Sequence, residues 1–126
     1  MHVEELMHVN SEIPLVKPDT VMRDTILEMT GKRLGCTAVI DDKGRLIGIF
    51  TDGDLRRLAQ QDEHFYARTV EEVMIRNPKT ISPGEILDKA LAVMEKHSIT
   101  VLPVVDDSHH PIGIIHLHDI LRSKLV

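Results

Sequence analysis

The sequence contains no tryptophan, one cysteine and only three other aromatic side chains, Phe50, Phe65 and Tyr66. The core of the fold must therefore be built from aliphatic residues. With Cys36 as the only cysteine, no intrachain disulfide can form, which favours a reducing cytoplasmic environment. No apolar run approaches the roughly 20 residues of a membrane-spanning helix, and no signal peptide is visible, so we expect no membrane partner.

An excess of basic charge is also missing. Fifteen lysines and arginines stand against 20 acidic residues, and the formal net charge is −5. Because nucleic-acid binding requires a basic face, this charge argues against a general nucleic-acid partner, although local basic spots are possible. Catalytic signatures are absent as well: there is no Walker loop and no Gly-x-Ser-x-Gly motif. Cys36 begins an apolar run, where a small buried hydrophobe is expected rather than a nucleophile. We therefore expect a chain that is not itself an enzyme.

What the chain does have is an internal repeat. Val3–Met7 (VEELM) recurs as Val70–Met74 (VEEVM), and residues 18–57 align with residues 83–122 without a gap. Two residue types that do not serve core packing are repeated with the apolar ones, namely Gly48 with Gly113 and Asp54 with Asp119. A domain of about 60 residues buries only about 60% of its unfolded surface and is marginal alone. The repeat thus predicts two similar half-domains that face each other across a pseudo-twofold axis.

Each half predicts the same order of elements. The prolines of an irregular stretch block a helix until after Pro18 and Pro83. Apolar residues at helical spacing then predict one helix in each half; these residues are Met22, Ile26 and Met29, and Leu87, Leu91 and Met94. The expected N-caps are Asp19 or Thr20 in the first half and Ser82 in the second.

A β-hairpin follows each of these helices. Its outgoing strands are expected at 36–40 and 101–105, its return strands at 46–51 and 112–116, and the final helices at 52–61 and 117–124. The turn at 41–44 is predicted to be tight, and the one at 106–111 looser. The result is a mixed α/β (α+β) fold. We expect half-domains at 3–61 and 70–126, joined by a linker at 62–69.

The junction between return strand and final helix is the sharpest chemical feature. In the first half, Thr51 ends a strand and Asp54 lies in the first helical turn. The helix N-terminus suits a phosphate, and a carboxylate at this position can accept hydrogen bonds from a ribose diol. A capping box that binds nothing explains the same two residues. The second half keeps Asp119 but has His116 in place of the threonine.

These features together resemble a tandem pair of CBS domains, also called a Bateman module. The resemblance rests on the doubled period, the strand sequence Leu102–Asp106 (LPVVD) and two Gly-x-x-x-x-x-Asp junctions. It implies two β-α-β-β-α half-domains that sense a nucleotide, either AMP- or ATP-like or a CMP-sugar, with no cofactor required. Thr51 and Asp54 would contact phosphate and ribose in one half, and His116 and Asp119 in the other. The base would lie in an apolar slot that the resemblance assigns to Leu15, Val16 and Thr37, and to Thr80, Ile81, Leu102 and Pro103.

A narrower resemblance is carried by Gly48–Arg57 (GIFTDGDLRR) and His116–Arg122 (HLHDILR). Both segments are similar to the C-terminal CBS pair of sugar-phosphate isomerases that interconvert D-arabinose 5-phosphate and D-ribulose 5-phosphate, on the pathway to the lipopolysaccharide sugar Kdo. The catalytic part of those enzymes is an N-terminal SIS domain, and nothing in this chain corresponds to it. The resemblance implies a regulatory fragment of such an isomerase, and a homodimer of modules.

Eight histidines are an unusual number for this length. His116 and His118 would share one face of an extended strand end, and Asp119 follows them, which are groups that could ligate Zn²⁺. His116 could instead replace threonine as an anion contact that responds to pH. Two further interpretations stay open: an oligomerisation scaffold with vestigial grooves, and a metal-binding module built on His116 and His118.

Overall fold

The computed structural model describes residues 1–125, and the chain divides into two compact units. Unit 1 contains Met1–Ile13 together with the chain from Lys79 onward, and unit 2 contains Pro14–Pro78. These units differ from the sequence repeats, which begin at Val3 and Val70. The start of the first repeat lies in Met1–Ile13 and belongs to unit 1, together with most of the second repeat. The start of the second repeat, at residues 70–78, belongs to unit 2, together with most of the first repeat. The two halves have therefore exchanged their leading segments.

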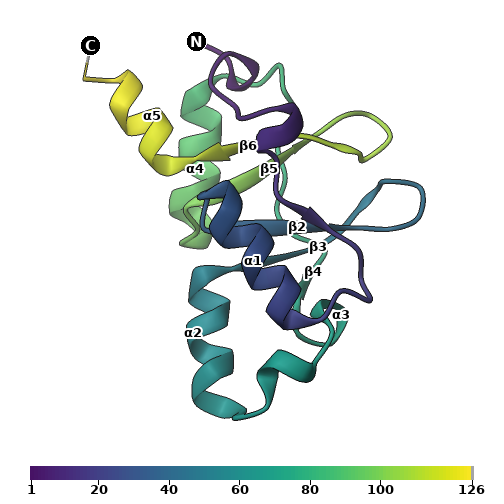
Figure 1. Ribbon diagram of the computed structural model, residues 1–126. Coiled ribbons are helices and arrows are strands. Elements are labelled where there is room, and N and C mark those ends of the chain that lie inside the picture. The colour runs from purple at the N-terminus through teal and green to yellow at the C-terminus, as the bar shows by residue number, and fades with distance from the viewer. Residues whose placement is uncertain (126) are drawn as a thin grey trace. The chain divides into compact units, whose positions relative to one another are not determined.

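Unit 2 is built around a four-stranded sheet in the order β1-β2-β3-β4. Strand β1 is parallel to β2, and the other neighbours are antiparallel. Helix α2 continues directly from β3 (Figure 1). The largest fully buried side chain is Phe50, which packs with Met22 and Val70. The elements are β1 (Leu15–Val16), α1 (Met22–Lys32), β2 (Cys36–Ile40), β3 (Leu46–Thr51), α2 (Asp52–Gln61), η3 (Phe65–Ala67), α3 (Val70–Val73) and β4 (Ile75–Arg76).

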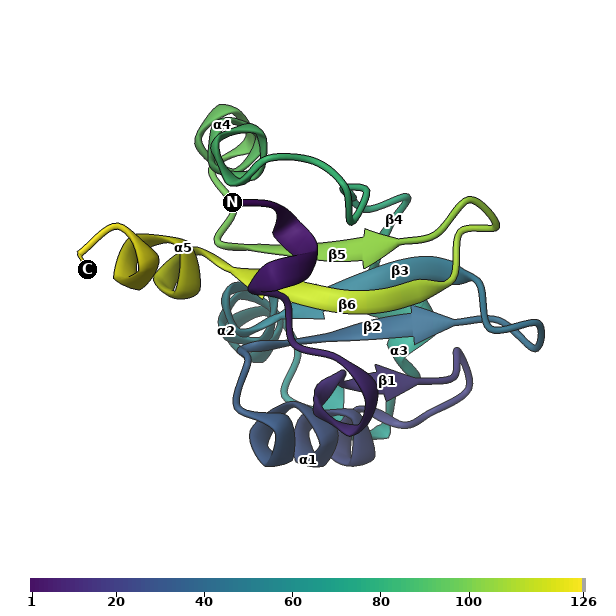
Figure 2. The ribbon, with the colours of Figure 1, turned by 90° about the horizontal axis from the view of Figure 1, so that it is seen from above.

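Unit 1 repeats this plan, but single bridges take the place of its two edge strands. Its elements are η1 (Val3–Glu5), η2 (Asn10–Glu12), α4 (Leu87–His97), β5 (Val101–Val105), β6 (Pro111–His116) and α5 (Leu117–Ser123). Strands β5 and β6 form an antiparallel hairpin, flanked by single bridges from Ile81 to Val104 and from His8 to Ile114. These bridges stand where unit 2 has β1 and β4. The N-terminal segment lies alongside β6 (Figure 2).

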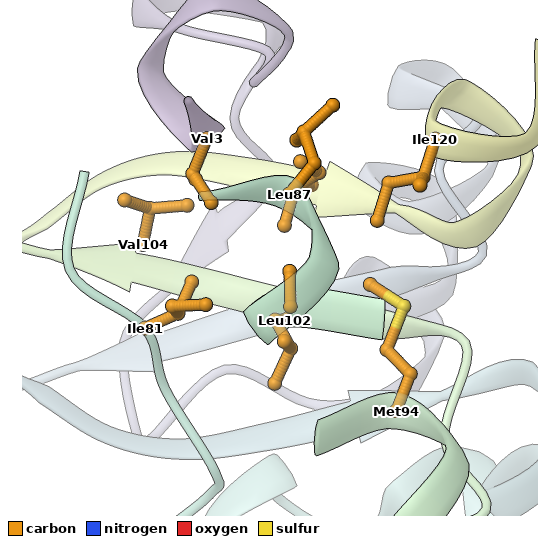
Figure 3. Packing of buried hydrophobic residues seen from close by; sticks show 9 residues of the cluster. Val3, Ile81, Leu87, Met94, Leu102, Val104 and Ile120 are labelled. Carbon is orange, nitrogen blue, oxygen red and sulfur yellow. The ribbon is translucent and has the colours of Figure 1, made fainter. Parts of the chain in front are cut away.

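The core of unit 1 is aliphatic, as the composition predicts. Val3 from the N-terminal segment packs with residues of α4, β5 and α5 (Figure 3). Met94, Leu102 and Ile120 are each at most 2% exposed. Val3 is fully buried although it is far in sequence from the rest of this cluster. The N-terminal segment is thus a structural part of unit 1.

The predicted hairpins and helices are confirmed, but the predicted N-caps are wrong. The N-caps are Val21 for α1 and Ile86 for α4, and neither has a side-chain cap. Backbone carbonyls from elsewhere in each unit satisfy the first amides instead: Met22 N donates to Arg68 O (2.8 Å) and Leu87 N to Met1 O (3.0 Å). Because a tertiary contact supplies the acceptor, no capping side chain is required. Both helices have 11 residues, and no helix within residues 1–125 is long and apolar enough to cross a membrane.

The expectation of a looser second hairpin turn is also wrong. Asp41 Oδ1 accepts from the amides of Lys43 and Arg45 (both 2.9 Å), and Asp106 Oδ1 accepts from the amides at the same two offsets. Both turns pass through a left-handed residue, which is Gly44 (φ 78°) in the first and His109 (φ 66°) in the second. A non-glycine residue pays a steric penalty in this conformation. The aspartate bonds therefore determine the turn, and glycine is not required for it.

The repeated glycines have a packing explanation. A Cβ atom on Gly48 would lie 2.4 Å from Met74 Sδ, and one on Gly113 would lie 2.5 Å from Met7 Sδ. These methionines end the repeated VEELM and VEEVM motifs. In each unit the repeated VEE-x-Met motif thus contacts the repeated glycine, which leaves room for the methionine side chain on the return strand.

We expect Gly113→Ala to destabilise unit 1 by about 1–3 kcal/mol, because the new methyl group overlaps Met7. Urea unfolding of the single variants and of Gly113→Ala combined with Met7→Ala measures the coupling. The double variant should cost clearly less than the sum of the two singles. Gly84→Ala is the control, since a Cβ there meets no atom within 4 Å. Strict additivity would contradict the packing explanation.

Candidate functional site

In unit 2 the junction between β3 and α2 is a closed local network. Thr51 Oγ1 accepts from the amide of Asp54 (3.3 Å), while the amide and hydroxyl of Thr51 donate to Asp54 Oδ2 (3.0 and 2.9 Å). The other carboxylate oxygen accepts from Arg57 Nη2 at 2.6 Å. The capping box that the sequence suggested is therefore present in the structure. The partners of Asp54 are both three residues away from it in sequence, so a rearrangement of this network breaks only local bonds.

Asp54 also lies on a groove of about 460 Å³ within unit 2. The groove carries charge of both signs. Arg57 pairs with Asp54 in it, and Arg68 pairs with Asp62 and Glu72. Its lining residues are Asp54, Arg57, Leu58, Gln61, Asp62, Arg68, Glu72 and Val73. A phosphate near Asp54 would find two guanidinium groups within one groove, each held by a carboxylate that it could exchange for the ligand.

In unit 1 the equivalent junction has different chemistry. His116 caps α5 by accepting the amide of His118 at Nδ1 (3.1 Å). In neutral His116 the ring proton is then on Nε2, which leaves one N–H donor where unit 2 has a hydroxyl. Burial lowers the pKa of His116, and His118 acts in the same direction. The neutral form of His116 is thus favoured in the folded chain. Protonation at Nδ1 would remove the acceptor for the His118 amide and with it the side-chain cap of α5.

Asp119 is the residue whose surroundings differ most from the prediction. Its side chain is 10% exposed, with one oxygen bound by Arg122 and the other by His8 Nε2 at 2.8 Å. Hydrogen bonds from His8 and Arg122 hold the pKa of Asp119 below its ordinary value, although burial alone would raise it. Asp119 is therefore a carboxylate with both oxygens engaged, and one of its partners comes from the N-terminal segment.

His8 was missed by the sequence reasoning. Its Nδ1 contacts Glu12 Oε1 (2.7 Å) and its Nε2 contacts Asp119 Oδ2 (2.8 Å). Burial lowers the pKa of His8, but the bonds to Glu12 and Asp119 outweigh this and raise it overall. A signal for this residue was present: directly after the repeated VEE-x-Met motif, His8 stands where the other copy has Ile75.

The residues predicted for the base slot lie together within each unit. In unit 2 they lie where β1 pairs with β2, and in unit 1 where Ile81 bridges to β5. Leu15 and Val16 pair with Ala38 and Val39, and the Ala38 amide donates to Pro14 O (3.0 Å). In unit 1, the Ile81 amide donates to Pro103 O (3.1 Å). The side chains of Thr37, Leu102 and Ile81 are buried, and Thr80 and Leu15 are half-buried. A ligand at these positions would therefore meet mainly backbone and the edges of Leu15 and Thr80.

The metal interpretation lacks ligands. The rings of His116 and His118 are 4.7 Å apart. Within residues 1–125 there is no group of three or more histidine, cysteine, aspartate or glutamate side chains placed to hold a metal ion. A zinc site requires at least three protein ligands. His116 instead acts as a helix cap, and Asp119 is engaged by His8 and Arg122.

Cys36 is fully buried, as its apolar surroundings predict, and burial raises the pKa of its thiol to about 12, with a smaller contribution from Asp52. Because the thiolate is the reactive form, Cys36 should be inert. We expect iodoacetamide to label Cys36 in the folded chain at least about a hundredfold more slowly than in urea-unfolded chain at the same pH. Mass spectrometry measures both rates, and equal rates would contradict the burial of this thiol.

The capping box makes a separate stability prediction. Thr51→Val removes the acceptor for the Asp54 amide and should lower the free energy of unfolding by about 1 kcal/mol. Thr51→Ser keeps the hydroxyl and should stay close to the wild type. Urea unfolding of both variants measures the difference. A Thr51→Ser variant as unstable as Thr51→Val would assign the effect to packing of the threonine methyl group instead.

Comparison with known proteins agrees with this geometry. The family model of the CBS domain matches the chain twice, over residues 3–60 and 70–125. Arabinose 5-phosphate isomerase KdsD of Francisella tularensis subsp. tularensis is 44% identical over 125 residues, covering 99% of this chain and 38% of that protein. KdsD of Escherichia coli K12 is 38% identical over 126 residues, covering 100% of this chain and 38% of that protein. The chain thus spans little more than a third of the length of these relatives.

Solved structures match over almost the whole chain. CBSX2 in complex with AMP has a TM-score of 0.83 at 26% identity, covering 98% of this chain and 96% of that one. The CBS domain pair of protein MJ0100, in complex with 5′-methylthioadenosine and S-adenosyl-L-methionine, has a TM-score of 0.88 at 25% identity, covering 98% and 95%. The expected fold, a mixed α/β pair of CBS half-domains, is confirmed.

Proposed function

The chain belongs to the CBS domain family, and on that premise we propose that it is a regulatory module that senses a nucleotide or nucleotide-sugar. One observation carries the proposal: both units place an aspartate, Asp54 or Asp119, in the first turn of the helix that follows the return strand. Relatives with this fold form complexes with AMP and with adenosine derivatives. The chemistry of the junction suits the phosphate and ribose of such ligands.

In unit 2 the proposed binding exchanges local partners. The ligand phosphate lies at the N-terminus of α2, where the helix dipole favours an anion and the Thr51 hydroxyl turns to donate to it. The ribose diol donates to Asp54. Arg57, whose side chain is 66% exposed, leaves Asp54 and pairs with the phosphate. The base lies against Leu15, Val16 and the backbone at Thr37. In unit 1, His116 and Asp119 take the equivalent roles beside Thr80, Ile81, Leu102 and Pro103.

We propose further that the module is the regulatory part of a D-arabinose 5-phosphate isomerase of the Kdo pathway. Support comes from the KdsD relatives, which are about 40% identical across this chain and extend well beyond the matched region. The catalytic work would then belong to an SIS domain, and this chain would contribute no catalytic residue. The assembly would be a cytoplasmic homodimer. Ligand binding could shift the equilibrium between two conformations of the isomerase by no more than the ligand's differential affinity for those two conformations.

A scaffold with vestigial grooves is the second candidate. The observation that favours it is that both carboxylates are already engaged, since Asp54 and Asp119 each have both oxygens bonded to groups of the chain itself. A scaffold of this kind would use these bonds only to hold the helices α2 and α5.

Calorimetric titration with AMP, ATP, CMP and a CMP-sugar separates the two candidates. We expect at least one of them to bind, and Asp54→Asn and Asp119→Asn each to weaken binding at its own site by tenfold or more, because a charged hydrogen-bond acceptor is lost. Asp42→Asn, on an exposed turn, is the control for the change in net charge. Absence of heat from all four nucleotides would favour the scaffold. Unchanged affinity in the double variant Asp54→Asn/Asp119→Asn would contradict the assignment of the sites.

A further inference from the structure

Asp119 differs from Asp54 in where its partners come from. The bonds of Asp54 go to Thr51 and Arg57, both within three residues of it. Asp119 instead binds His8, which is 111 positions away in sequence. A ligand that takes over Asp54 has to break only local bonds. A ligand that takes over the Asp119 oxygen bound by His8 has to break a bond that holds the N-terminal segment to α5.

The geometry around His8 requires a particular protonation state. Both ring nitrogens lie within 2.8 Å of a carboxylate oxygen, Nδ1 at Glu12 and Nε2 at Asp119. A neutral imidazole has one N–H and can donate to only one of them, whereas the imidazolium donates to both. The bridge from Glu12 through His8 to Asp119 is therefore complete only when His8 carries a positive charge.

The same residue is tied to the strand by its backbone. The His8 amide donates to Ile114 O (2.8 Å) and the Ile114 amide donates to His8 O (3.0 Å). The preceding residue, Met7, packs on Gly113. In unit 2 the equivalent of His8 is Ile75, which pairs with Ile49 but has an apolar, half-exposed side chain. The bridge is thus specific to unit 1.

We propose that His8 governs access to Asp119: the imidazolium bridge fastens the N-terminal segment to α5, and a ligand with a vicinal diol must displace His8 to reach the carboxylate. The bridge follows from the geometry alone, whereas its competition with a ligand rests on the proposed function. The N-terminal segment and the ligand are then alternative partners of one carboxylate. Binding at the Asp119 site loosens residues 1–13. Binding at Asp54 leaves the corresponding segment of unit 2, residues 70–76, in place.

The bridge responds to pH in a defined direction. The charged and titratable groups that face it are Glu12 of η2, Asp119 and Arg122 of α5, and His116 at the end of β6. The pKa of His8 is raised, so its contribution is complete below the pKa of a free histidine and is lost as pH rises through the folded value. The pKa of Asp119 is lowered, so its contribution is lost only as pH falls through that lowered value. The bridge is complete between these two values and opens on the alkaline side.

Hydrogen exchange at the Ile114 amide tests the bridge without any ligand. In the wild type its protection factor should fall about tenfold between about pH 6 and about pH 9, as His8 loses its proton. In His8→Gln protection should be low at both values. Exposed His97 on α4 supplies the control His97→Gln, which should behave like the wild type. Glu12→Gln keeps His8 and Asp119 in contact and should give an intermediate result. Equal protection in the wild type and in a folded His8→Gln would overturn the bridge.

AMP titration in an Asp54→Asn background tests the competition, because it reports the Asp119 site alone. We expect His8→Gln to bind AMP at least about fivefold more tightly than the background at about pH 6, with a smaller difference at about pH 9. Binding that is lost in Asp119→Asn but is indifferent to His8→Gln would overturn the competition and leave the proposed function intact. If AMP does not bind, the same comparison uses whichever of ATP, CMP and the CMP-sugar binds the wild type. If none of the four binds the wild type or any variant, the proposed function and the competition both fail, whereas the exchange data still decide whether the bridge exists.

Discussion

The contact on which each unit depends is a methionine lying on a glycine. Met74 covers Gly48 in unit 2 and Met7 covers Gly113 in unit 1, at distances that leave no room for a Cβ atom. The leading segment can therefore lie flat on the return strand and form backbone bonds with it, as His8 does with Ile114. The strand leads directly into the helix that carries the aspartate. One close contact thus sets where the leading segment stands relative to the junction.

This shared scaffold supports two different polar sites. The turns that begin the return strands are held by the same bonds to Asp41 and Asp106. The two replacements that change the bonds of the junction are Thr51 and Ile75 of unit 2, which correspond to His116 and His8 of unit 1. The first site is closed by its own neighbours in sequence, and the second by a residue of the N-terminal segment. The two copies thus keep the methionine–glycine contact and the aspartates, and they differ in the polar side chains that surround Asp54 and Asp119.

Much of this could be predicted from the sequence, because it is encoded locally. The hairpin strands and α2 follow from alternation, turn residues and helical spacing, and their predicted limits agree with the structure to within one residue. The predictions failed where a distant backbone group replaced a local signal. The caps of α1 and α4 come from Arg68 and Met1, so Asp19 and Ser82 were not needed. The second turn was misjudged because His109 adopts the left-handed conformation that glycine has in the first.

By itself the sequence determined the repeat, the order of the elements, the aspartates at both junctions and the family, since all of these depend on spacing along the chain. Only the tertiary structure decided which leading segment belongs to which unit, and with it the partner of Asp119. The physical reason is that the bond from His8 to Asp119 joins residues 111 positions apart. The contact of Met7 with Gly113 and the burial of Val3 in the core of unit 1 place His8 where this bond can form. No local pattern carries that information, because the two ends of the contact become neighbours only when the unit folds.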